Sequence, residues 1–159
     1  MLKSFLSVSG ALLLLLSIFV SPVEASSLPQ AVNFEVSTVI PPDGTSPTYG
    51  PFTATGPAVD GGLICPTGQT QDAFVKAQGG QSGKIVTLQV IKQFTCDNGS
   101  GEFFVKLEVR LDQKGDNFNW MIIRGTGTYE KLHGTGQGVG LPIPEGVFDI
   151  YEGFVISTK

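Results

Sequence analysis

The clearest pattern in the chain is an alternation of apolar and polar residues with the two-residue period of a β-strand. Residues 30–39 and 102–111 both place apolar side chains at every second position: Val32, Phe34 and Val36 in the first, and Phe103, Val105, Leu107, Val109 and Leu111 in the second. A helix would scatter the valines of the second segment around its surface, so the period of two favours strands. Phe104 is the exception, because it falls on the charged face.

Other runs rich in β-branched and aromatic residues also predict strands. These runs are residues 62–65, 73–77, 84–96, 118–123 and 146–157. Asn98-Gly99 separates two predicted strands, and this dipeptide indicates a hairpin because both residues tolerate a positive φ. No segment predicts a helix with similar clarity. Six to eight strands joined by short turns predict an all-β, antiparallel barrel or sandwich.

Residues 40–57 do not follow this pattern. They contain five prolines, which lack the N–H group that a strand donates to its neighbour: Pro41, Pro42, Pro47, Pro51 and Pro57. Asp43-Gly44 marks a turn within the segment. We therefore predict one long irregular connection, which is either a functional flap or a covering loop.

The composition narrows the class of protein. Gly and Pro contribute 21 and 10 of the 159 residues, which disfavours long helices. Charged residues make up only 15% of the chain, whereas disordered tails are rich in charge. The net charge of −4 disfavours binding to nucleic acid, which needs a basic face.

The N-terminal region has the three parts of a secretory signal peptide. Lys3 supplies the positive charge, residues 11–20 are apolar, and Val23 and Ala25 stand at the −3 and −1 positions of a cleavage site after Ala25. An uncleaved anchor is the alternative, but the apolar run is shorter than the roughly 20 residues that span a bilayer. We predict a signal peptide over 1–25 and one secreted domain over 26–159, periplasmic in a Gram-negative bacterium and without a stable membrane anchor.

The two cysteines, Cys65 and Cys96, are an even count on an oxidising route, which predicts a disulfide. A structural zinc site needs more ligands than two cysteines and the one histidine of the chain. The separation of 31 positions also differs from the C-x-x-C spacing of redox motifs. We therefore expect no metal and no cofactor.

Glycines recur at every second position from Gly134 to Gly140. Phosphate binding does not explain them, because Gly125-x-Gly127 has Glu130 where a dinucleotide fingerprint needs a third Gly, and no Gly-Lys-Ser/Thr is present. As a strand, the segment has one face without side chains. Such a face lets the strand bend sharply or lets an aromatic ring lie on its backbone.

Around these glycines the chain resembles a known group of proteins. The string Trp120…Gly125-Thr126-Gly127-x-Tyr129-x-x-Leu132-x-Gly134-Thr135-Gly136 is similar to the signature hairpin of the allene oxide cyclase-like and dirigent-like β-barrels. Cys65-Pro66, Phe94-x-Cys96 and Gly99-Ser100-Gly101 resemble small secreted bacterial members without an assigned function. The resemblance implies an eight-stranded antiparallel barrel with a central cavity, and it leaves open an oligomer through the outer faces. The polar and acidic cavity residues of those families have no match here, so no catalytic residue is carried over.

Four residues are candidates to line a ligand cavity: Trp120, Tyr129, Asp149 and Tyr151. Aromatic residues at strand spacing are more often core. A buried Asp149 would be a functional candidate, but alternation with Phe148 and Ile150 favours an outward carboxylate. We place His133 in an exposed tight turn, not in a catalytic site.

The leading hypothesis is a secreted barrel without enzymatic activity that binds a small apolar molecule in its lumen. The first alternative is an isomerase or lyase of the cyclase or dirigent kind. The second is an interaction module that uses residues 40–57. Asn98 also begins a glycosylation sequon, Asn98-Gly99-Ser100, which the hairpin turn already explains.

Overall fold

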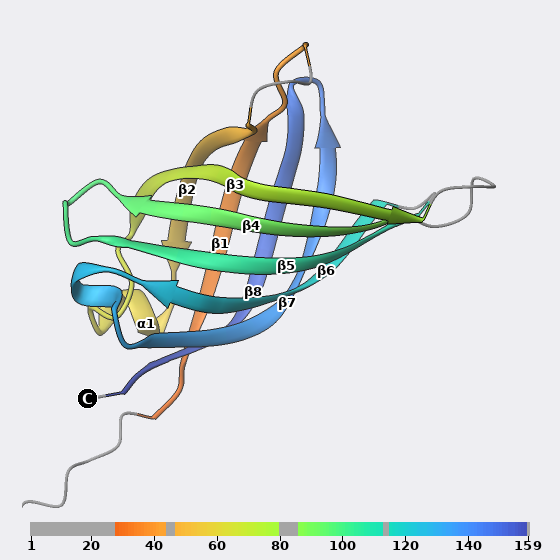
Figure 1. The fold of residues 1–159 in the computed structure, drawn as a ribbon. Coiled ribbons are helices and arrows are strands. Elements are labelled where there is room, and N and C mark those ends of the chain that lie inside the picture. Colours follow the sequence, from red (N-terminus) through yellow and green to blue (C-terminus); the bar gives the residue numbers. More distant parts are fainter. Residues whose placement is uncertain (1–27, 44–46, 80–85, 113–114, 159) are drawn as a thin grey trace, which may run out of the picture.

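The computed structural model describes residues 28–43, 47–79, 86–112 and 115–158, so the predicted signal peptide lies outside the described residues. The described chain forms one closed barrel in which each strand pairs with its neighbours in sequence and the last pairs with the first (Figure 1). The strands are β1 (Gln30–Val39), β2 (Tyr49–Thr55), β3 (Thr67–Gly79), β4 (Val86–Cys96), β5 (Glu102–Asp112), β6 (Gly115–Gly125), β7 (Leu132–Ile143) and β8 (Gly146–Ser157). All eight pairings are antiparallel, which confirms the predicted barrel.

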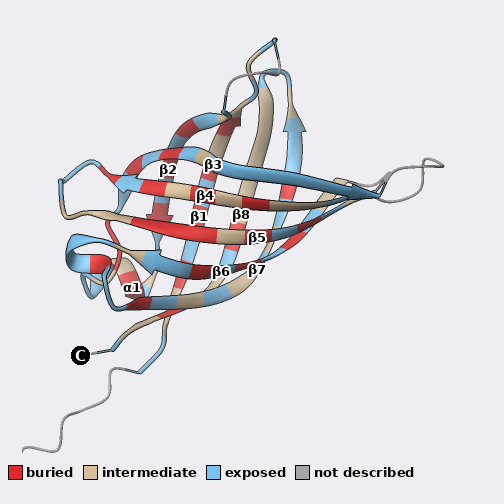
Figure 2. Cartoon of the chain, viewed as in Figure 1, coloured by how far each residue is buried: buried red, intermediate tan, exposed pale blue. Residues whose placement is uncertain are grey.

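Aromatic rings fill the middle of the barrel. Phe34 of β1 lies among five of them, with ring centroids 5.6–6.3 Å from those of Phe52, Phe94, Phe103, Trp120 and Tyr151. Each of these rings is almost completely buried. The alternation of β1 and β5 predicts this arrangement. Figure 2 shows buried residues along both strands, as a continuous run from Phe103 to Val105 in β5 and at alternate positions in β1.

One end of the barrel is closed by short helical segments and the disulfide, and we call it the disulfide end. α1 (Pro57–Asp60) places Ala58 in the core, and η1 (Gly127–Tyr129) does the same with Tyr129. Cys65 is bonded to Cys96 at the end of β4, with 6.0 Å between the Cα atoms, as predicted. The strand predicted for residues 62–65 is wrong. The amides of Leu63 and Ile64 both donate to the carbonyl of Ala58, which makes a turn after α1.

The prediction of one irregular segment over residues 40–57 is also wrong, because β2 occupies its second half. The chain accommodates Pro51 where pairing is incomplete. The β1–β2 ladder pairs Val36 with Phe52 and Val39 with Tyr49, and no pair is formed between them.

The glycines of β7 face the barrel interior, as one side of a strand without side chains. A Cβ atom on Gly136 would lie 2.7 Å from the Trp120 ring, and one on Gly138 would lie 2.2 Å from the Phe118 ring. Of the two roles expected for this face, a sharp bend or an aromatic ring on the backbone, the structure shows the second. His133 is exposed as predicted, but it belongs to β7 and not to a turn.

The β4–β5 turn and the exceptional position of Phe104 also have clear structural explanations. Gly99 has a φ of +71° in the turn between β4 and β5, which confirms the hairpin predicted from Asn98-Gly99. Phe104 is buried although it lies on the charged face of β5, because the guanidinium of Arg124 covers its ring at 3.7 Å.

Candidate functional site at the polar end of the barrel interior

Opposite the disulfide end, the inner positions of the barrel change from aromatic to polar. On the inner face of β4, Lys92 stands two residues before Phe94. On the inner face of β8, Asp149 stands two residues before Tyr151. Thr38 of β1 and Asp72 of β3 complete the group, which we call the polar cluster: Thr38, Asp72, Lys92 and Asp149. The fold brings these four side chains together from four different strands.

A continuous chain of contacts joins the polar cluster. The ammonium of Lys92 lies 2.8 Å from Oδ1 of Asp72 and donates to Oγ1 of Thr38 at 3.3 Å. Thr38 in turn donates to Oδ2 of Asp149 at 3.1 Å. Thr48 donates to the other oxygen of Asp72. Lys92 is 3% exposed, so its charge depends on these partners for compensation.

The environment of Asp149 gives its carboxyl an unusual protonation equilibrium. Burial raises its pKa from 3.8 to about 6, while Lys92 and the hydrogen bond from Thr38 lower it in part. The carboxylates of Asp72 and Asp116 add to the rise. A carboxyl with a pKa near 6 can give or take a proton near neutral pH, which an ordinary aspartate does much less effectively.

Tyr151 lies beside the polar cluster and is completely buried. Its hydroxyl has no hydrogen-bond partner among the described residues. Burial raises its pKa well above 10, and the carboxylates of Asp149 and Asp72 raise it further, so the hydroxyl keeps its proton. A buried hydroxyl without a partner is rare, because leaving a donor unpaired costs about 1–3 kcal/mol.

Beyond the polar cluster, the inner positions become apolar again, and several of them are partly exposed, although Val109 is buried. We call these residues the apolar rim: Val75, Val86, Leu88, Val109 and Leu111. The rim is accessible because β2 ends its pairing with β3 at Gln71, so within the described chain residues 73–79 of β3 pair only with β4. Figure 2 shows this half of β3 as exposed, and Val75 is 54% exposed.

The structure separates the four predicted cavity residues. Asp149 and Tyr151 meet at the polar end. The prediction that Asp149 points outward is wrong, because its carboxyl is buried and accepts a hydrogen bond from Thr38. The pattern of β8 does not reveal this, since both faces of the strand carry apolar residues. Trp120 lies in the core, where its Nε1 donates to the carbonyls of Gln137 and Glu152. Tyr129 lies at the disulfide end, and its hydroxyl contacts Ser100 at 2.7 Å and Cys96 at 3.2 Å.

The sequence prediction missed Lys92, Asp72 and Thr38. Lys92 had a visible signal, because it interrupts a series of apolar residues at every second position of β4, from Val86 to Phe94. A lysine in such a series is expected to have a buried partner of opposite charge. The sequence does not identify that partner, because Asp72 lies next to a β-bulge that changes the facing of β3.

Comparison with known families found no family model that matches the chain, and no curated protein matches it either. The resemblance to the allene oxide cyclase-like and dirigent-like barrels therefore stays a prediction. In the described part of the chain, no helix is long and apolar enough to cross a membrane. Among the same residues, no group of three or more His, Cys, Asp and Glu side chains is arranged to hold a metal ion.

Proposed function

We propose that the protein is an exported β-barrel that binds a small, mainly apolar, uncharged molecule at the polar end of its interior. The observation that carries the proposal is the buried hydroxyl of Tyr151, which lacks a partner beside the polar cluster. A ligand with one accepting oxygen would satisfy this donor. An eight-stranded barrel is either filled by its side chains or holds one small ligand. Because aromatic rings fill the middle of this barrel, the proposed ligand would occupy the polar end alone.

The charges of the polar cluster favour a neutral ligand. Lys92 is already engaged by Asp72 and Thr38, and Asp149 adds a second carboxyl nearby. An anionic group would meet two carboxylates and one lysine whose charge is compensated. An alcohol, ketone or ester avoids this repulsion, and its hydrocarbon part would lie against the apolar rim.

Export is the second part of the proposal. Disulfides persist in oxidising compartments, and the Cys65–Cys96 bond agrees with the signal peptide predicted for residues 1–25. Native mass spectrometry of protein recovered from culture medium tests this directly. We expect a chain that begins at Ser26, contains the disulfide and carries additional mass from a bound molecule.

Substitution of Tyr151 tests the proposed binding mode. The neutral fluorophore N-phenyl-1-naphthylamine serves as the probe, and 2-decanone, which has one accepting oxygen, displaces it. We expect Tyr151→Phe to weaken the displacement by 2-decanone about tenfold, the equivalent of one hydrogen bond. Tyr129→Phe is the matched control, because it removes the other buried tyrosine hydroxyl at the disulfide end, and its affinity should not change. Absence of probe binding, or an equal loss in both variants, would refute the proposal.

An isomerase or lyase is the second candidate function, and the carboxyl of Asp149 is the observation that favours it. A carboxyl with a pKa of about 6 can act as a general acid or base on a molecule held next to it. Asp149→Asn keeps the shape of the side chain and removes this chemistry. Turnover of a fatty-acid epoxide or a phenolic substrate that is lost in Asp149→Asn while binding persists would support the enzyme. Binding without turnover in the unmodified protein would support the carrier.

A further inference from the structure

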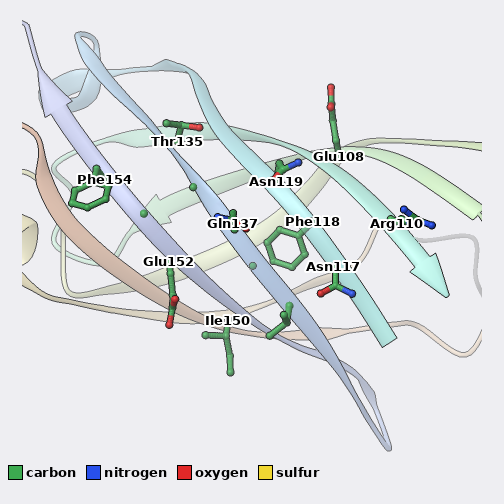
Figure 3. Close-up of a pocket in the computed structure, with 14 residues that line it drawn as sticks. Glu108, Arg110, Asn117, Phe118, Asn119, Thr135, Gln137, Ile150, Glu152 and Phe154 are labelled. Atoms are coloured by element: carbon green, nitrogen blue, oxygen red, sulfur yellow. The ribbon is translucent and has the colours of Figure 1, made fainter. Parts of the chain in front are cut away.

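The outer surface of β5 to β8 contains a groove of about 900 Å³, which is separated from the interior site by the barrel wall. Figure 3 shows the residues of β5, β6, β7 and β8 that line it. None of the residues of the polar cluster lines it. The groove is therefore a second candidate site, independent of the proposed interior ligand.

The inward-facing glycines explain why a barrel wall is concave here. A Cβ atom on Gly153 would lie 2.5 Å from the Trp120 ring, so β8 approaches this ring as closely as β7 does at Gly136. Strands with larger inner side chains would stand further from the rings inside. Because β7 and β8 lie directly on Trp120 and Phe118, their outer faces are drawn toward the barrel axis.

A row of four polar side chains crosses the floor of the groove. Neighbouring strands place them directly opposite one another: Glu108, Asn119, Gln137 and Glu152. With strands about 4.8 Å apart, the row extends about 14 Å. Within the described chain, the side chains of Asn119, Gln137 and Glu152 make no hydrogen bond or ion pair to protein, so they remain available to a ligand.

Apolar surface flanks this polar row on both sides. Phe154 lies on one side, opposite Thr135, and its side chain is 58% exposed. Val139 and Ile150 form an opposed pair on the other side. A ligand in the groove would therefore meet amide and carboxyl groups in a line, with an aromatic ring and aliphatic groups beside them.

We propose that this groove binds a neutral oligosaccharide. Sugar hydroxyls both donate and accept hydrogen bonds, which matches the amides of Asn119 and Gln137 because each carries a donor and an acceptor. The C–H faces of the sugar rings match Phe154 and Ile150. The carboxylates at the two ends of the row, Glu152 and Glu108, which is paired with Lys106, accept hydrogen bonds from sugar hydroxyls. The volume of the groove also agrees with the size of ordinary small-molecule sites.

Isothermal titration calorimetry with cellotetraose, maltotetraose and chitotetraose tests the proposal. We expect at least one of these neutral oligosaccharides to bind. Gln137→Ala and Phe154→Ala should each weaken this binding about tenfold, because each removes one principal contact. Gln69→Ala is the matched control, since Gln69 is an exposed glutamine on β3 outside the groove, and it should leave the affinity unchanged.

The same titrations contain the outcomes that overturn the inference. It is wrong if none of the three oligosaccharides binds at millimolar concentration, or if Gln69→Ala weakens binding as much as Gln137→Ala. Binding of a lysine-rich peptide, but of no saccharide, would assign the two glutamates to a different kind of partner and also refute it. Tyr151→Phe should bind the saccharide normally, so a failed interior site and a failed groove give different results.

Discussion

The two ends of the barrel interior use similar residue types to different effect. Tyr129 at the disulfide end and Tyr151 at the polar end are both buried tyrosines. The hydroxyl of Tyr129 has Ser100 and Cys96 as partners, whereas that of Tyr151 has none among the described residues. The disulfide end also has α1, η1 and the Cys65–Cys96 bond to cover it. Among the described residues, the polar end is covered by the apolar rim, most of whose side chains are partly exposed.

This difference indicates that the disulfide end mainly stabilises the fold, whereas the polar end carries the groups suited to binding a ligand. At the disulfide end, every feature we describe contributes to packing or to a satisfied hydrogen bond. At the polar end, a compensated lysine, a carboxyl with a raised pKa and an unpaired hydroxyl all reduce stability compared with an apolar core. Such groups are most easily explained when a ligand uses them. Four pairs of measurements test the contrast.

The largest difference should come from a side chain in the aromatic core compared with one at the apolar rim. Phe94→Ala removes a completely buried ring that contacts Phe34, Phe52 and Phe103, and we expect it to lower the free energy of unfolding by about 3–5 kcal/mol. Leu88→Ala at the apolar rim should lower it by about 1 kcal/mol, because part of that side chain is already exposed. Urea denaturation measures both values. Equal losses would show that the apolar rim is packed as tightly as the aromatic core.

Removal of the disulfide should have the next largest effect. The double substitution Cys65→Ser and Cys96→Ser releases a loop of about 30 residues, which the chain-entropy account relates to about 3–4 kcal/mol. We expect thermal unfolding to shift accordingly, while the affinity for N-phenyl-1-naphthylamine stays unchanged because the probe binds at the other end. A parallel loss of affinity would show that the two ends are not independent.

Asp149 should make stability at the polar end depend on pH. The pKa of its carboxyl is about 6 in the folded protein, compared with the ordinary value of 3.8 that applies to the unfolded chain. Above pH 6 the folded state therefore holds a poorly solvated charge. As the pH falls through 6, the folded protein takes up this proton before the unfolded chain does, and the destabilisation decreases. Between pH 7.5 and 5, the protein should gain about 1 kcal/mol relative to Asp149→Asn. Parallel pH profiles of unfolding for the two proteins would contradict the inward placement of Asp149.

The smallest effect should come from the two tyrosine hydroxyls, and the two variants should differ in sign. Tyr129→Phe loses satisfied hydrogen bonds and should destabilise the protein by about 1 kcal/mol. Tyr151→Phe removes an unpaired buried donor and should leave the ligand-free protein equally stable or slightly more stable. Calorimetric melting of the ligand-free proteins distinguishes the two. Destabilisation by Tyr151→Phe would mean that the hydroxyl already has a partner in the free protein.

The strands that the sequence predicted well are those with one apolar and one polar face. β1 matches its predicted bounds, and β5 matches them to within one residue, because burial on one side leaves a clear period of two. β2 was missed because Pro51 normally excludes a strand, yet here it occupies a gap in the β1–β2 ladder. Residues 62–65 were assigned to a strand because they are apolar, but they reach the core from a turn.

The candidate site was harder to predict than the fold, since it depends on contacts between distant strands. Asp149 and Tyr151 share a strand, so the sequence could suggest both, but β8 does not reveal which face is buried. The partners Asp72 and Lys92 become opposed only through the pairing of β3 with β4, just before the bulge. The concave outer face was equally hidden, because it depends on how closely two aromatic rings approach the β7 and β8 backbones.

The alternating glycines of β7 also determine how this strand can align with its neighbours. A strand usually selects its register by burying an apolar face, and the inner face of β7 from Gly134 to Gly140 has no side chains to bury. A slip by one residue would place Thr135, Gln137 and Val139 against Trp120 and Phe118, where not even a methyl group fits. The rings therefore favour the observed register of β7, because the shifted alignment would force side chains into the space that Trp120 and Phe118 occupy.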